Sequence, residues 1–270
     1  SRKAASIIVF LKLLKYKASL HPQVLNFLLC AFWAMGINPQ NANLLGKVGA
    51  VELVVRVYKS LRKKLNVGEP SESNGVTVGV LIQRVLGVLF VLVFAESNQV
   101  RIADQRCLRI LHDAIKTNEN KIIATAIAIV WKLAENNTCA ASLVSHQFVP
   151  TLLEITKKSS LPPKCRKHTA NVLEVLSLSP TLQRSFVPKS KLESTDETMI
   201  EMMLIRLLRD NNFELNAYAG RSLAKLAMSQ RQHVILKLRG IQHLLQVVQR
   251  AANQSPPVMF SDAALDNALM

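Results

Sequence analysis

Side chains that could perform catalysis are scattered along the sequence and form no catalytic motif. The sequence contains no GxSxG, no P-loop, no GxGxxG and no HExxH, the short patterns that place a nucleophile, a phosphate cradle or a zinc site. The histidines are spread along the chain, at positions 21, 112, 146, 168, 233 and 243. These observations predict a protein that is not an enzyme and that has no cofactor.

One pair of metal-ligand types stands at helical spacing. Cys165 and His168 lie three residues apart and could share one face of a helix. A structural zinc site takes about four ligands, and no second pair accompanies these two. We therefore interpret them as a cysteine near a loop and a solvent-facing histidine, and we predict no metal site. Neighbouring acids are interpreted as helix caps and solvated faces: Asp104, Asp113, Asp196 and Glu197.

The cysteines lie far apart, at positions 30, 107, 139 and 165, without the dense spacing of a disulfide scaffold. This usage is typical of a reducing compartment, which predicts a cytoplasmic location, with a nuclear one also open. The chain opens on Ser1, and its final segment, SDAALDNALM, still reads as a helix. We therefore expect a segment of a longer protein.

Positive charge is concentrated near the N-terminus. The formal net charge is +16, and residues 1–68 hold eleven Lys or Arg against the single acid Glu52. A positive field of this kind attracts acidic protein segments, nucleic acid or anionic lipid.

Helices must position these side chains, because a short helical pattern recurs along the chain. Its copies are FLKLL at Phe10, LVVRV at Leu53, ILHDA at Ile110, LLEIT at Leu152, LIRLL at Leu204 and LLQVV at Leu244, so the steps are 43, 57, 42, 52 and 40 residues. The two longest steps contain insertions rich in turn residues, at 66–76 and 179–195. Without these insertions the unit is about 40 to 45 residues, the length of an armadillo or HEAT repeat.

A second, more apolar helix follows each copy of the pattern. The segment at 76–95, VTVGVLIQRVLGVLFVLVFA, is nearly apolar enough to cross a bilayer. Gln83 and Arg84 oppose insertion, and the segment is in step with four other helices that do not read as membrane spans. We therefore predict a buried helix and no transmembrane span, although some strand character stays open at 76–80.

The chain resembles the armadillo family, best over residues 198–250, where MLIRLLRDNNFELNAYAGRSLAKLAMSQRQHVILKLRGIQHLLQVV keeps the family's order of helices. It also resembles the family over 41–58, NANLLGKVGAVELVVRVY, with its Asn-led turn and Gly-Ala. The middle repeats depart from the pattern, because Arg106-Cys107 and Gln147-Phe148 stand where Gly-Ala is usual. The resemblance implies an all-α, right-handed α-solenoid of about six armadillo- or HEAT-like repeats with truncated ends, forming one domain over 1–270.

In armadillo proteins the third helix of each repeat lines a concave groove, and importin-α-like members hold basic peptides there with Trp and, four residues later, Asn. No corresponding pair in this sequence is Trp followed by Asn, so the resemblance disfavours a nuclear-import receptor. The groove residues that it implies here are Trp33, Leu89, Trp131, Glu135, Asn171, Arg221 and Lys225. The two tryptophans are open to a second interpretation as core residues between repeats.

A basic helix face accompanies this groove. In VELVVRVYKSLRKKL, an apolar stripe runs along one side, and the other side carries Arg56, Lys59, Arg62 and Lys63. We therefore predict a noncatalytic scaffold that binds a partner protein or peptide, acidic in character, through the groove and this basic face. The alternatives are a basic module that binds nucleic acid or an anionic membrane surface, and a regulatory arm of a larger enzyme. Ser71 and Ser73 are candidate modification sites in a loop.

Overall fold

The structure is a computed structural model, and it describes residues 21–67, 72–73, 75–156, 161–178, 199–209, 213–228, 235–236 and 239–253. The chain divides into two compact units, unit 1 over Ser1–His146 and unit 2 over Gln147–Met270. The predicted helix at Phe10, the insertion at 179–195 and Ser71 lie outside the described residues. A single domain over 1–270 stays a prediction.

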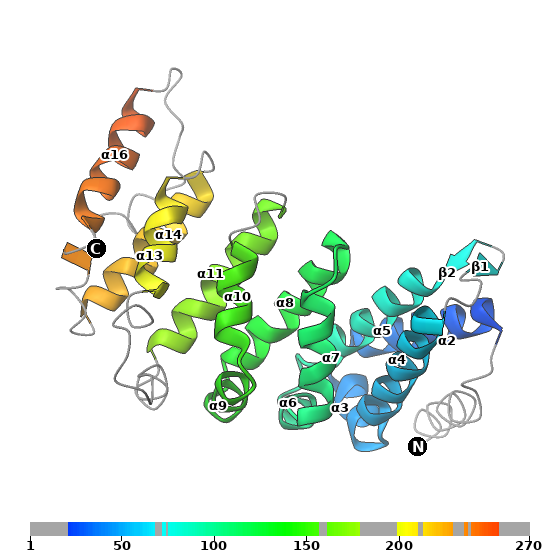
Figure 1. The fold of residues 1–270 in the computed structure, drawn as a ribbon. Coiled ribbons are helices and arrows are strands. Elements are labelled where there is room, and N and C mark those ends of the chain that lie inside the picture. The colour runs from blue at the N-terminus through cyan, green and yellow to red at the C-terminus, as the bar shows by residue number, and fades with distance from the viewer. Residues whose placement is uncertain are drawn as a thin grey trace. The chain divides into compact units, whose positions relative to one another are not determined.

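Unit 1 is built from helices of three kinds that alternate along the chain. Short first helices are α3 (Pro39–Lys47), α6 (Glu96–Ile102) and α9 (Asn137–Ser145), second helices are α4 (Ala50–Val67) and α7 (Gln105–Ile115), and third helices are α2 (Pro22–Gly36), α5 (Val78–Leu92) and α8 (Asn120–Ala134). Helices of one kind pack against each other: α2 on α5 and α5 on α8, α4 on α7, and α3 on α6 and α6 on α9 (Figure 1). Unit 1 is therefore a stack of repeats, as the recurring pattern predicts.

The apolar segment at 76–95 forms the centre of this stack. Helix α5 contacts α2, α4 and α8, so side chains on most of its circumference are buried, among them Leu81, Val85 and Leu92. Within the described part of the chain, no helix combines the length and the apolar character that crossing a membrane needs. The strand that the sequence left open at 76–80 is present over two residues only: β2 (Val76–Thr77) pairs antiparallel with β1 (Glu72–Ser73). The Thr77 hydroxyl then accepts a hydrogen bond from Val80 N at 3.2 Å and caps α5.

The helices described in unit 2 are second helices, α10 (Phe148–Thr156), α13 (Met199–Leu208) and α16 (Gly240–Ala252), which alternate with third helices, α11 (Pro163–Leu178) and α14 (Phe213–Leu226). The third helices α11 and α14 pack on each other, and the second helices pack in the row α10, α13, α16. Every described copy of the recurring pattern, from LVVRV to LLQVV, therefore lies in a second helix.

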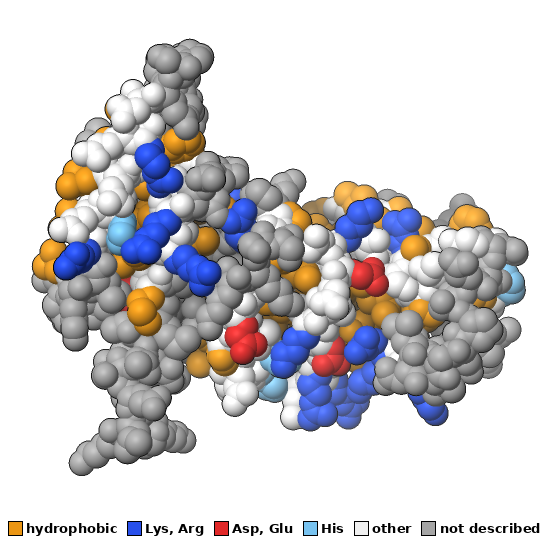
Figure 2. Space-filling view, turned by 45° about the horizontal axis from the view of Figure 1, so that its top comes forward, with side chains coloured by type: hydrophobic (Ala, Val, Ile, Leu, Met, Phe, Trp, Pro, Cys, Tyr) orange, Lys and Arg blue, Asp and Glu red, His pale blue; other side chains and the backbone are white. Residues whose placement is uncertain are grey.

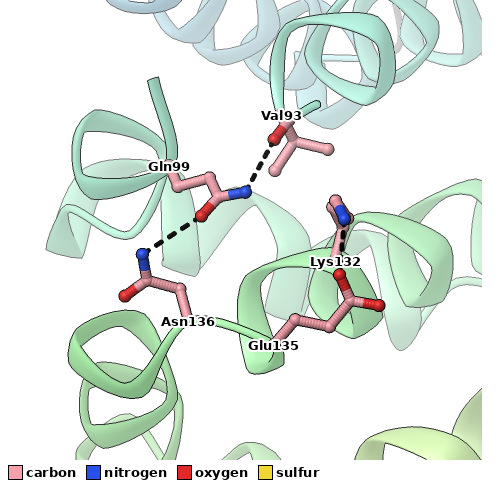
Figure 3. Close-up of polar contacts among 5 residues, drawn as sticks. All are labelled: Val93, Gln99, Lys132, Glu135 and Asn136. Atoms are coloured by element: carbon pink, nitrogen blue, oxygen red, sulfur yellow. Dashed lines mark hydrogen bonds and ion pairs between the residues drawn. The ribbon is translucent and has the colours of Figure 1, made fainter. Parts of the chain in front are cut away.

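Buried amides join the first helices of unit 1. Asn98 on α6 is 1% exposed, and its Nδ2 donates to Ala42 O on α3 at 2.9 Å and to Leu92 O at the end of α5 at 3.0 Å. Gln99 donates to Val93 O at 3.2 Å and accepts from Asn136 Nδ2 at 3.2 Å (Figure 3). Asn136 also caps α9 through its Oδ1. Because these amides satisfy backbone groups of neighbouring repeats, they fix the register of the stack.

Candidate partner-binding surfaces

Trp33 lies over helix α5 on the third-helix face of unit 1. The guanidinium carbon of Arg84 lies 5.6 Å from the centre of the Trp33 ring, and Arg84 Nε donates to Asn26 Oδ1 at 3.3 Å. A Cβ on Gly87 would lie 3.6 Å from the indole, so the bare backbone there gives the ring a flat support. Trp33 is 38% exposed. It is therefore neither a core residue nor a free side chain, but a supported ring with a cation beside it.

The prediction that Leu89 lines the groove was wrong, because this side chain is 0% exposed. The exposed side at the end of α5 is formed by the half-buried Phe90 and by Phe94, which lies just beyond the helix and is 52% exposed. The two ring centres are 5.1 Å apart in an edge-to-face arrangement. On α8, Lys132 Nζ lies 5.6 Å from the centre of the Phe94 ring and forms an ion pair with the exposed Glu135 at 2.5 Å (Figure 3). Trp131, next to Lys132, is half-buried.

In unit 2 a tyrosine on α14 lies close to two cations. Lys167 Nζ on α11 is 4.5 Å from the centre of the Tyr218 ring, and the guanidinium carbon of Arg221 is 4.6 Å from it. Lys225 is exposed and pairs with the buried carboxylate of Glu174, which also accepts from Ser222 Oγ at 2.6 Å. The charge of Lys225 is therefore matched by an acid. Asn171, on α11, is half-buried.

The basic face predicted on α4 is present, and it extends onto α7. Arg56, Lys59 and Lys63 are exposed and Arg62 is half-buried. Because α4 packs on α7, the exposed Arg106 and Arg109 of α7 belong to the same face. Figure 2 shows Lys and Arg side chains gathered along the lower edge of unit 1. The arginines of α7 were not predicted as part of this face, although the recurring pattern aligns ILHDA with LVVRV and could have placed them.

The buried titratable groups of unit 1 are core residues with suppressed ionisation. Burial, reinforced by the charges of Asp104 and Glu52, raises the pKa of Cys107 to about 12. Burial also raises the pKa of Tyr58 to about 12, against the lowering effect of Arg62. A thiol with so high a pKa is not a nucleophile at neutral pH.

Cys165, near the start of α11, is buried, and His168, which was predicted to face the solvent, is half-buried. Among the described residues, no three His, Cys, Asp or Glu side chains lie close enough together to hold a metal ion.

No protein-family model matches the sequence, and no curated protein shows a significant match. The structure is similar to a designed armadillo repeat protein solved in complex with the peptide (KR)4, at a TM-score of 0.72 and 13% identity, over 96% of this chain and 95% of that one. A computationally designed armadillo repeat protein for modular peptide recognition matches at a TM-score of 0.69 and 13% identity, over 96% and 95% of the two chains. An engineered protein matches at 0.71 and 14%, over 96% and 93%. The chain is therefore an all-α solenoid with an armadillo-like repeat fold.

Proposed function

We propose that this protein is a noncatalytic scaffold that binds an acidic segment of a partner protein along its third-helix faces. The observation that carries the proposal is the placement of cations on aromatic rings in both units: Arg84 on Trp33, and Arg221 on Tyr218. Each pair presents an apolar ring surface beside a cation that can bind a carboxylate of the partner.

The charge of the chain selects the sign of the partner. A similar structure holds the basic peptide (KR)4, whereas the present chain carries a net charge of +16. Like charges across an interface are repelled, and opposite charges increase the rate of association. We therefore infer that an acidic peptide replaces the basic one, and that the basic face of α4 and α7 adds long-range attraction.

Replacing the half-buried Arg221 with glutamine is expected to weaken binding of the fluorescein-labelled peptide (EY)4 about three- to tenfold, because one charge-assisted contact is lost. Fluorescence anisotropy of the peptide with the full chain measures this change. The matched control is Arg206→Gln, which removes an exposed arginine from α13 in the same unit. Equal losses for Arg221→Gln and Arg206→Gln would show that only net charge matters.

The second candidate is a module that binds nucleic acid, favoured by the exposed arginines and lysines of α4 and α7. Measuring the affinity at a series of salt concentrations distinguishes nucleic acid binding from binding of an acidic peptide. Phosphate binding weakens steeply with salt through release of counterions, whereas contacts on aromatic rings retain an apolar component. Tighter binding of the oligonucleotide (dT)12 than of (EY)4 at 0.15 M salt would favour the second candidate.

A further inference from the structure

A cavity of about 600 Å³ opens in unit 1 where α4 meets α6 and the start of α7. It lies among first and second helices, not on the third-helix face. Its volume is within the range of about 300 to 1,000 Å³ that is usual for ligand sites. Its lining residues are Val51, Glu52, Val55, Arg56, Lys59, Val100, Arg101, Asp104, Arg106 and Cys107.

The floor of the cavity is apolar. Val51, Val55 and Cys107 are 2%, 6% and 1% exposed, so they are held by the core and present fixed methyl and thiol surface. Val100, on α6, is 60% exposed and extends this apolar surface to the solvent. Exposed valine beside a concave apolar floor gives an apolar side chain of a partner a place to be buried.

The acids that line the cavity already have partners. Glu52 forms an ion pair with Arg101 at 3.2 Å, which links α4 to α6. Asp104 accepts a hydrogen bond from Arg106 N at 3.1 Å and caps α7. The cavity lining still has more cations than acids, because Arg56, Lys59, Arg101 and Arg106 stand against these two carboxylates.

The remaining cations at the rim are not matched in this way. Arg56 and Lys59 on α4 and Arg106 on α7 are exposed, and none of them forms an ion pair with another described residue. The rim therefore presents positive charge from two helices around an apolar floor, and it is complementary to an apolar group flanked by anions.

We propose that this cavity binds a large apolar side chain of a partner protein, phenylalanine or leucine, that is flanked in sequence by acidic residues. The apolar side chain enters between α4 and α6, and the flanking carboxylates bind Arg56, Lys59 and Arg106. This inference deepens the proposed function, since it assumes an acidic protein partner, but it names a separate site and a separate residue pattern in that partner.

The test uses the full chain with ¹³C-labelled valine methyl groups and the peptides EEDFEDE and EEDGEDE. The Phe peptide is expected to shift the methyl signals of Val55 and Val100 and to bind about tenfold more tightly than the Gly peptide, because only the Phe side chain is buried. Arg106→Gln is expected to weaken the Phe peptide at least fivefold. The matched control is Arg109→Gln, which removes an exposed arginine one turn further along α7 that does not line the cavity.

A second variant changes Val100, at the exposed edge of the cavity. Val100→Glu places a negative charge beside the apolar floor of the cavity. Because Val100 is exposed, the substitution is expected to leave thermal unfolding unchanged. Loss of Phe peptide binding without a change in thermal unfolding supports the proposal. Equal affinities of the Phe and Gly peptides, or equal effects of Arg106→Gln and Arg109→Gln, would overturn it in favour of diffuse attraction. Tighter binding of (dT)12 at the same methyl groups would also overturn it. Arg221→Gln is expected to leave the shifts of the Val100 methyl signals unchanged. The proposal for this cavity and the proposal for the third-helix faces are therefore tested separately.

Discussion

Replacing Gly46 with alanine is expected to lower the free energy of unfolding of unit 1 by about 2 to 4 kcal/mol, because it displaces a buried amide that holds two repeats together. A Cβ at Gly46 would lie 1.6 Å from Oδ1 of Asn98. Asn98 cannot move aside without losing its hydrogen bonds to Ala42 O and Leu92 O. Urea unfolding followed by tryptophan fluorescence measures this loss in unit 1, because Trp33 and Trp131 both lie there.

A double-mutant cycle isolates this close approach from general helix effects. In an Asn98→Ala background, Gly46→Ala is expected to cost close to zero, since the new methyl group occupies space that the amide has left. Gly87→Ala is the matched control, because its Cβ would meet the Trp33 ring at an ordinary 3.6 Å, and it is expected to stabilise α5 by about 0.5 to 1 kcal/mol. The same cost for Gly46→Ala in both backgrounds would rule out the amide as the cause.

The architecture could be predicted from sequence because it depends on a period. The recurring pattern at Leu53 and Ile110 places α4 and α7 in equivalent positions, and the structure packs them together. The buried side of α4 was also predictable, since Val51, Val54 and Tyr58 follow helical spacing and are all buried. Periodicity therefore determines which helices are neighbours, even where the Gly-Ala pattern of the family is missing.

The exposed face of α5 could not be predicted in the same way. This helix contacts α2, α4 and α8, so apolar residues cover both its buried and its exposed sides, and hydrophobic spacing cannot tell them apart. Leu89 and Phe90 are equally apolar in the sequence, yet Leu89 is fully buried and the side chain beside it reaches the surface. On α14, where polar and apolar residues alternate by face, the predicted Arg221 does lie beside an aromatic ring.

The asparagines at the starts of the first helices recur along the sequence. Asn38 and Asn136 both cap a short first helix through the side-chain oxygen, and Asn98 lies in the first turn of α6, which is also a first helix. Polar residues in these segments were interpreted only as breaks between helices. Their recurrence once per repeat indicates a structural role that spacing could have shown.

The cavity between α4, α6 and α7 lay beyond sequence reasoning for a different reason. Glu52 and Arg101, whose ion pair forms one wall, are separated by 49 residues, and no local pattern indicates that they meet. The basic face was predictable as a run of charge on α4, but its concave shape arises only when α6 packs beside that helix. The charge of this surface could therefore be predicted from the sequence, whereas the shape of the cavity could not.

Raising the pH from 8 to 11 is expected to lower the free energy of unfolding of unit 1 by about 2 to 3 kcal/mol through Cys107 alone. The folded chain keeps the thiol protonated because its pKa is raised to about 12, whereas the unfolded chain releases the proton near pH 9. Over this range the unfolded state binds fewer protons than the folded state, so stability is present below pH 9 and is lost as the pH rises toward 12. Tyr58, with its pKa also raised to about 12, adds a smaller loss above pH 10.

The variants that test this dependence remove the ionising groups and keep the packing as far as possible. Cys107→Ala is expected to reduce the slope of unfolding free energy against pH between 9 and 11 by about 1 kcal/mol per pH unit, whatever its effect on stability at pH 7. Tyr58→Phe, which keeps the ring, is expected to reduce the slope only above pH 10. Urea unfolding at each pH, in the presence of a reductant, gives these slopes. Cys165→Ala is the control, because Cys165 lies in unit 2 and both tryptophans lie in unit 1. If Cys107→Ala has the slope of the parent chain, the thiol ionises without unfolding, and Cys107 is accessible to hydroxide through the neighbouring cavity.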